Sequence, residues 1–357
     1  QLVSGFYPNR IPNPDLKWEK TGQFDIGFDL GLFNNRLRLT ADYYYKKTTD
    51  LLYNVAIPSA SGYDSMLKNI GSVQNKGYEL SIESDNLSGA FSWTTAFNIS
   101  FNRNKVLELG GETYKDVGTY DDHLKTSDIR RLIVGQPIGV FYGYRFDGIF
   151  QNEAECAQQT SSPSPIGVGL RRYKDLNGDG KIDATNDREI LGDANPKFFG
   201  GMTNTFAYRG FELNVFLQYS YGNKIFNYNA MELESPTGGQ NVYQDLVNRW
   251  TPTNPSNEYQ KATTNRNNIV SDRFIEDGSF LKLKTVSLSY SFPKLNWNHI
   301  GGLRLYVTGQ NLLTWTKYRG YDPEVSYRGA STLEAGEDFG GYPQARTFMF
   351  GIKLDIK

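Results

Sequence analysis

The chain has 357 residues, and its 38 Lys and Arg nearly balance 39 Asp and Glu, giving a formal net charge of −1. This balance, without a basic patch, argues against nucleic-acid binding, and the single cysteine, Cys156, excludes an internal disulfide. Because His123 and His299 are the only histidines, a histidine-based triad or a multi-histidine metal site is nearly excluded.

The composition combines many aromatic residues with a polar average. Aromatics make up 14% of the chain, yet the mean hydropathy is −0.54. A membrane β-barrel reconciles the two values, because only every second strand residue faces lipid while the lumen is polar and aromatics ring both interfaces. No run of 18 apolar residues indicates a transmembrane helix, which does not argue against a barrel.

The first elements in chain order form a predicted β-hairpin. Residues 1–10 read as loop without the basic and apolar segments of a signal peptide, which favours a start inside a longer protein. Apolar residues then occupy every second position over 24–32 and again over 37–45, with a short connection at 33–35. Period-two alternation on both sides of a short turn predicts two paired strands.

The same alternation recurs along the chain and predicts about ten strands. Further clear examples cover these ranges: 91–101, 211–219, 286–292, 303–307 and 348–356. Short connections lie at 34–35, 85–89 and 208–210, and long ones at about 51–68, 106–137, 151–196, 224–273 and 319–343. Short periplasmic turns opposite long extracellular loops are the plan of a bacterial outer-membrane barrel.

One long connection carries a predicted calcium loop, Asp-Leu-Asn-Gly-Asp-Gly-Lys-Ile-Asp at 175–183. Side-chain oxygens at positions 1, 3 and 5, with Gly180 at the sharp turn, form the oxygen cage that Ca²⁺ prefers. The candidate ligands are Asp175, Asn177, Asp179, Lys181 through its carbonyl, Asp183 and Asp187. The closing ligand stays open between Asn186 and Asp187, and the alternative is an Asp/Asn/Gly turn that binds nothing.

Aromatic residues in the long connections are candidates for gripping a ligand. They are Tyr114, Tyr120, Tyr228, Tyr243, Trp250 and Tyr259. The alternative is that they pack loops or belong to the aromatic girdles of the barrel. The loop carboxylates Glu153, Glu155, Glu232 and Glu234 do not fix the separation that glycoside hydrolysis needs, so we expect no enzyme.

Several sequence words occur in an order that resembles the SusC/RagA family of TonB-dependent outer-membrane transporters of Bacteroidetes. They include NPDLKWEKTGQFDIGFDLGLFNNRL (13–37), NIGSVQNKGYEL (69–80), GQPIGVFYGYRFDGIFQ (135–151), FIEDGSFLKLKTVSLSY (274–290) and LRLYVTGQNLLTWTKYRGYDPE (303–324). The match is to about the C-terminal third of such proteins.

The resemblance implies an all-β fold in which residues 1–357 are the C-terminal part, about ten antiparallel strands, of a plugged barrel of about 22 strands. Residues 170–195 would be the calcium-binding-like extracellular loop. The implied partners are the plug and first strands of the barrel, a SusD-like surface lipoprotein and the TonB–ExbB–ExbD complex. The implied activity is import of oligosaccharides or peptides across the outer membrane.

Two positions depart from the family pattern, and two other functions remain open. Asp187 comes one residue later than the usual closing aspartate, and Ile356 followed by Lys357 replaces the usual final aromatic residue. The alternatives are a calcium-stabilised surface binding or adhesion barrel and a passive porin. About ten strands would leave two costly unpaired edges in lipid, so we expect this chain to pair with preceding strands.

Overall fold

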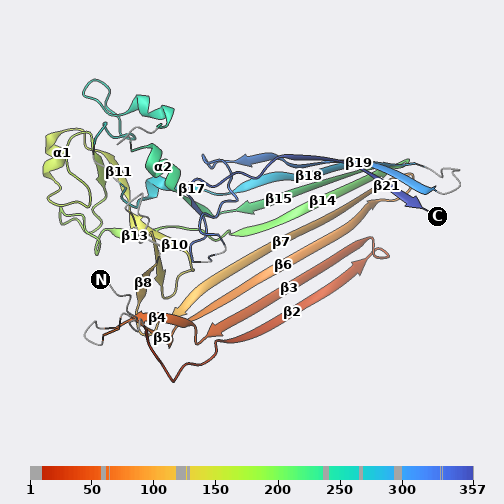
Figure 1. The fold of residues 1–357 in the computed structure, drawn as a ribbon, viewed down its shortest axis with the longest axis horizontal. Coiled ribbons are helices and arrows are strands. Elements are labelled where there is room, and N and C mark those ends of the chain that lie inside the picture. Colours follow the sequence, from red (N-terminus) through yellow and green to blue (C-terminus); the bar gives the residue numbers. More distant parts are fainter. Residues whose placement is uncertain are drawn as a thin grey trace, which may run out of the picture.

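The computed structural model describes residues 10–57, 62–63, 65–117, 126, 129–235, 241–264, 268–292, 300–329, 331 and 333–356. Its main body is a nine-stranded antiparallel sheet, in which each strand pairs with the next one in the order β2-β3-β6-β7-β14-β15-β18-β19-β21 (Figure 1). The bounds are β2 Lys20–Leu32, β3 Leu37–Thr49, β6 Ser72–Leu87, β7 Phe91–Glu108, β14 Phe198–Tyr208, β15 Phe211–Tyr221, β18 Phe280–Ser291, β19 Ile300–Thr316 and β21 Thr347–Ile356.

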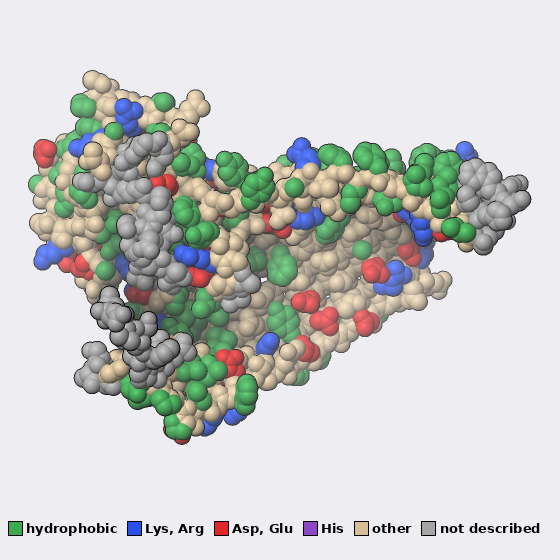
Figure 2. Space-filling model, viewed as in Figure 1, with side chains coloured by type: hydrophobic (Ala, Val, Ile, Leu, Met, Phe, Trp, Pro, Cys, Tyr) green, Lys and Arg blue, Asp and Glu red, His purple; other side chains and the backbone are tan. Residues whose placement is uncertain are grey.

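The two faces of this sheet differ in polarity because side chains alternate along each strand. In β2, Phe24, Ile26 and Phe28 lie on one face, each more than half exposed, and Asp25 and Asp29 lie on the other. The register continues the apolar face across the sheet, since apolar positions pair with apolar positions from strand to strand. The sheet curves, and acidic side chains gather on its concave face near β2 and β3 (Figure 2).

Tight turns join the strands at one end of the sheet. The β2–β3 turn has positive φ at Phe33, Asn34 and Asn35, and the β14–β15 turn has φ of 46° at Arg209 and 87° at Gly210. In the two-residue β14–β15 turn, positive φ at both central residues gives the turn a twist that matches that of the antiparallel strands it joins. The long connections all emerge at the other end and build a separate layer (Figure 1). This confirms the predicted division into short turns and long loops.

The sequence predicts about ten strands, whereas the large sheet has nine. The stretch between the predicted long connections 106–137 and 151–196 forms two short strands, β10 (Val140–Tyr144) and β11 (Phe146–Ile149), which pair within the loop layer instead. As a result, 109–197 is one continuous long connection between β7 and β14. Short strands and membrane-length strands share the same period, so alternation alone does not separate them.

The loop layer consists of small sheets and short helices. Its further strands are β1 Arg10–Ile11, β4 Leu52–Ala56, β5 Ser65–Asn69, β8 Tyr114–Val117, β9 Arg130–Ile133, β12 Arg171–Tyr173, β13 Arg188–Asp193, β16 Lys224–Asn227, β17 Ile275–Asp277 and β20 Glu337–Asp338. The helices are α1 Glu153–Ala157, α2 Tyr228–Leu233, η2 Gln244–Asn248 and η3 Asp272–Phe274. The hydrophobic core of the molecule lies here, around Phe141, Phe226, Met231 and Phe274, each fully buried.

Two further features concern the helices and the edges of the large sheet. Among the described residues, no helix is long and apolar enough to span a bilayer. Within the described residues the sheet is open, because β2 and β21 end its strand order and each pairs with one neighbouring strand. Each therefore carries a row of backbone N–H and C=O groups available for pairing with another strand.

Candidate functional site in the loop layer

The predicted calcium loop folds into a tight curl around its first aspartate. The Asp175 carboxylate accepts hydrogen bonds from Gly178 N at 2.6 Å and from Gly180 N at 2.7 Å. Both glycines have positive φ, 76° and 78°, which glycine adopts without strain. Asn177 Nδ2 donates to Asp179 Oδ2 at 3.1 Å, so the three predicted side-chain ligands lie on one short stretch.

The end of the loop is held by two further aspartates. Asp187 is fully buried and accepts from Leu176 N and Asp183 N, each at 2.8 Å, so it ties the beginning of the loop to its end. Asp183 accepts from the N–H groups of Asn186 and Thr185, and these bonds hold the pKa of its carboxyl below the usual value. Of the two candidates for the closing position, Asp187 is thus the buried carboxylate and Asn186 a donor to Asp183.

The donor chemistry of the loop suits a hard cation, whereas its side chains bond to the loop's own N–H groups. The carboxylate oxygens of Asp175 and Asp187 each accept one of these bonds and retain a lone pair, whereas Asp183 Oδ1 accepts two. No group of three or more His, Cys, Asp or Glu side chains converges on one point in the described part of the chain. The predicted calcium site also uses the side-chain oxygen of an asparagine and a backbone carbonyl oxygen, and neither belongs to these four side-chain types.

The predicted ligand-gripping aromatics are dispersed rather than gathered in one cleft. Tyr228 is only 3% exposed and packs against Phe226 with ring centroids 4.8 Å apart, so its ring belongs to the core. Tyr259 is 8% exposed, and burial raises its pKa to about 12. Trp250 donates from Nε1 to Gln151 at 3.0 Å.

The other predicted aromatics are more peripheral. Tyr243 is half-buried beside the core, with the Arg319 guanidinium 5.8 Å from its ring centroid. Tyr114 is 48% exposed on β8, away from the rest. Tyr120 lies outside the described residues.

A cluster that sequence reasoning missed surrounds Tyr114. The Arg131 guanidinium lies 3.9 Å from the ring centroids of both Tyr114 and Tyr142. It also forms a two-pronged ion pair with Asp116, at 2.6 and 3.0 Å. The contributing residues come from adjacent strands, β8, β9 and β10. The only sequence signal is their alternation along short strands, which does not reveal that those strands pair.

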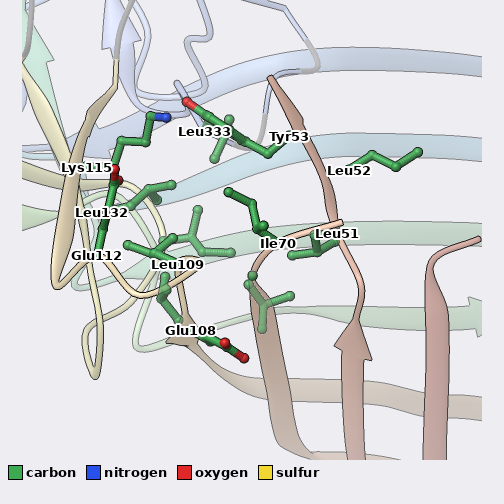
Figure 3. Close-up of a pocket in the computed structure, with 14 residues that line it drawn as sticks. Leu51, Leu52, Tyr53, Ile70, Glu108, Leu109, Glu112, Lys115, Leu132 and Leu333 are labelled. Carbon is green, nitrogen blue, oxygen red and sulfur yellow. The ribbon is translucent and has the colours of Figure 1, made fainter. Parts of the chain in front are cut away.

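An apolar cavity of about 310 Å³ lies on the opposite side of the same small sheet. Figure 3 shows Leu51 and Ile70 approaching it from the β4–β5 hairpin, with Leu109 and Leu132 on the other side. Lys115 lines it as well, and its ammonium lies 3.8 Å from the Tyr53 ring centroid. The cavity separates the hairpin from the sheet of β8 and β9.

Buried ion pairs hold the connection between β19 and β21 against β18 of the large sheet. Lys282 on β18 is 1% exposed and bonds Asp322 at 2.6 Å and Glu324 at 2.5 Å. Lys284 also bonds Glu324, at 2.9 Å. Burial alone would raise the pKa values of both carboxyls, but the hydrogen bonds from Lys282, with Lys284 added at Glu324, leave them below the usual values.

A second buried pair joins that connection to β9. Arg130 is fully buried and donates to Glu337 at 2.9 Å and to the Gly139 carbonyl at 2.6 Å. Burial lowers the pKa of Arg130, and burial raises the pKa of Glu337. The candidate carboxylate Glu234 is also sequestered: it is 1% exposed and pairs with Arg273 at 2.7 Å.

Comparison with known proteins identifies this architecture. Residues 2–219 match the family described as "TonB dependent receptor-like, beta-barrel". The chain belongs to the TonB-dependent receptor family. Members of this family are outer-membrane β-barrel proteins, so the nine long strands cross the outer membrane, with their apolar face toward lipid and their polar face toward the lumen.

Individual relatives agree with this assignment. TonB-dependent receptor P3 of Formosa agariphila is 40% identical over 99% of this chain, and SusC of Bacteroides thetaiotaomicron is 29% identical over 96% of it. The solved RagAB peptide transporter is similar over 96% of this chain, with 27% identity and a TM-score of 0.78. The chain spans 36%, 32% and 36% of the lengths of these three proteins, respectively.

Proposed function

We propose that this chain forms part of the wall and extracellular loop layer of a transporter that imports oligosaccharides or peptides across the outer membrane. The observation that carries the proposal is the open nine-stranded sheet with an apolar convex face and a polar concave face. The rest of the wall and a plug would close the lumen, a SusD-like lipoprotein would cover the loop layer, and TonB with ExbB and ExbD would supply energy.

The names of the relatives support import rather than catalysis. RagAB is described as a peptide transporter, and SusC as a TonB-dependent receptor. Within this chain, Glu234 is engaged in ion pairs with Arg273 and Arg319. The proposed role of the chain is to form part of a passage and to bind a ligand.

The test is uptake by cells that carry the full-length gene or lack it. A fluorescently labelled oligosaccharide pool and a labelled peptide pool are supplied separately, with and without a functional TonB. If the chain belongs to an importer, cells take up one of the two pools, and this uptake is lost when either the transporter gene or the TonB gene is deleted. Uptake that persists without TonB would contradict the proposal in favour of a porin, and surface retention without uptake would contradict it in favour of an adhesion barrel.

We also propose that Asp175, Asn177, Asp179 and the Lys181 carbonyl hold a structural Ca²⁺. The oxygen donors and the two positive-φ glycines support it, and buried Asp187 would brace the loop in that state. The Asp183 carboxylate would become a further ligand if its side chain rotated away from the backbone N–H groups that it now accepts from, such as that of Thr185. The ion would order residues 170–195 rather than take part in transport chemistry.

Metal analysis of the purified full-length protein tests this second proposal. Asp179→Ala is expected to lower bound Ca²⁺ and to make residues 170–195 more susceptible to proteolysis, while the barrel still assembles. Ser88→Ala, in the short turn between β6 and β7, is the matched control and should leave both readouts unchanged. Equal calcium content in the Asp179 variant and the wild type would refute the site.

A further inference from the structure

A groove of about 510 Å³ lies on one face of the small sheet formed by β8, β9, β10 and β13. Tyr114, Asp116, Arg131 and Tyr142 line its floor, and Ala184 and Thr185 line it as well. The last two residues belong to the end of the predicted calcium loop. The conformation of that loop therefore shapes the groove.

The floor is a ladder of alternating aromatic and cationic side chains across four strands. Arg131 lies 3.9 Å from the ring centroids of Tyr114 and Tyr142, and Arg188 lies 5.1 Å from that of Tyr142. Tyr142 Oη donates to the Arg188 carbonyl at 2.8 Å. These contacts hold the planar groups in place, so the ladder is organised before any ligand arrives.

The ladder retains contact area and hydrogen-bonding capacity. Tyr114 remains 48% exposed although Arg131 covers part of its ring. Nε and Nη2 of Arg131 bond Asp116, whereas its Nη1 has no partner among the residues that the structure describes. The Asp116 side chain is 32% exposed, so its carboxylate has lone pairs open to the groove.

We propose that this groove binds a sugar ring of an oligosaccharide. The ring stacks on the exposed part of Tyr114, Nη1 of Arg131 donates to one hydroxyl, and the Asp116 carboxylate accepts from the neighbouring hydroxyl. This inference rests on the proposed import function and names its substrate class.

The charge state of the pair favours a sugar over a peptide. Arg131 is already neutralised by a two-pronged bond to Asp116, so the pair presents a donor and an acceptor side by side rather than an uncompensated cation. A sugar hydroxyl both donates and accepts, so two adjacent hydroxyls match such a pair. A peptide carboxylate would meet the Asp116 charge at close range.

The test uses the full-length transporter, purified in detergent and screened against an array of neutral and acidic oligosaccharides and against a peptide pool. We expect the wild type to bind at least one oligosaccharide class. Tyr114→Ala and Arg131→Met should each weaken that binding by about 10- to 100-fold, the effect of losing contacts to a charged or stacked partner. Tyr114→Phe should keep it, because the ring is retained.

Lys115→Met is the matched control, since Lys115 is the next residue on β8 but lines the apolar cavity on the opposite face. It should leave binding unchanged. The inference is overturned if no oligosaccharide binds, if the Tyr114 and Arg131 variants bind as well as wild type, or if the peptide pool is what these variants lose.

The oligosaccharide array and the uptake experiment test different claims, so a negative result in one leaves the other claim standing. If uptake depends on TonB but the Tyr114→Ala variant binds oligosaccharide as well as wild type, only the proposed sugar site in the groove is refuted. Binding that depends on Tyr114 in a protein without TonB-dependent uptake would refute only the import function.

Discussion

An arginine placed on the outer face of the wall should destabilise the barrel far more than the same arginine placed one residue away on the inner face. Val286 lies near the middle of β18 on the apolar face, between Val215 of β15 and Gly309 of β19. The next residue, Ser287, faces the lumen between Asn214 and Thr308.

The magnitude follows from the two surroundings. Arginine on the lipid face costs about 2–4 kcal/mol at the bilayer midplane, and Val286→Arg has only apolar neighbours and a glycine beside it. This corresponds to about a 30- to 700-fold shift in the folding equilibrium, since about 1.4 kcal/mol is tenfold. Ser287→Arg enters a polar lumen, where its guanidinium stays hydrated, so we expect a loss below about 1 kcal/mol.

The assay is urea unfolding of the full-length protein in phospholipid vesicles, followed by tryptophan fluorescence and by the mobility shift of folded barrels on gels. Both variants are compared with wild type in the same lipid. Equal destabilisation by the two arginines, or a larger loss from Ser287→Arg, would refute the assignment of lipid and lumen faces.

Two further outcomes concern the loop layer. Glu337→Gln should destabilise it by about 3–5 kcal/mol, because Arg130 is left buried without its carboxylate partner. Glu83→Gln, in an exposed ion pair with Arg38, should cost less than about 1 kcal/mol. Thermal unfolding monitored by hydrogen exchange distinguishes the two variants, and equal losses of stability would contradict the burial argument. The depressed pKa values of Asp322 and Glu324 stabilise the fold above their unfolded pKa values near 4, and this contribution is lost as the pH falls through the lower folded values. Hydrogen exchange around these carboxylates should therefore accelerate below about pH 4, and a rate that follows only the intrinsic pH dependence would contradict it.

The long strands were predictable because their period-two pattern is local. The hairpin of β2 and β3 pairs Phe28 with Ala41 and Leu30 with Leu39, as the alternation of residues 24–45 predicts. No local pattern over β10 shows that this strand pairs with β13 in the loop layer. That pairing joins Tyr144 to Arg188, far along the chain, and local periodicity contains no such information.

The site was less predictable than the wall for the same reason. Asp175 and Asn177 could be proposed as calcium ligands from the sequence because the ligands of such a loop follow one another along the chain. Arg131 was missed because Asp116 and Tyr142 approach it only through strand pairing. Tyr228 was a candidate for ligand contact because it is an aromatic residue in a long connection, but the packing of its ring against Phe226 places it in the core.

The central claim is that the nine-stranded sheet crosses the outer membrane with the loop layer outside the cell. Single cysteines at Thr253 and Glu153, both exposed in the loop layer, and at Ser88, in a short turn, test it directly in the full-length protein. Native Cys156 is buried and should contribute little background. With a bulky polyethylene glycol maleimide, the two loop positions should be labelled on intact cells, and Ser88→Cys only after the outer membrane is permeabilised. Labelling of Ser88→Cys on intact cells, with Thr253→Cys and Glu153→Cys protected, would contradict the account.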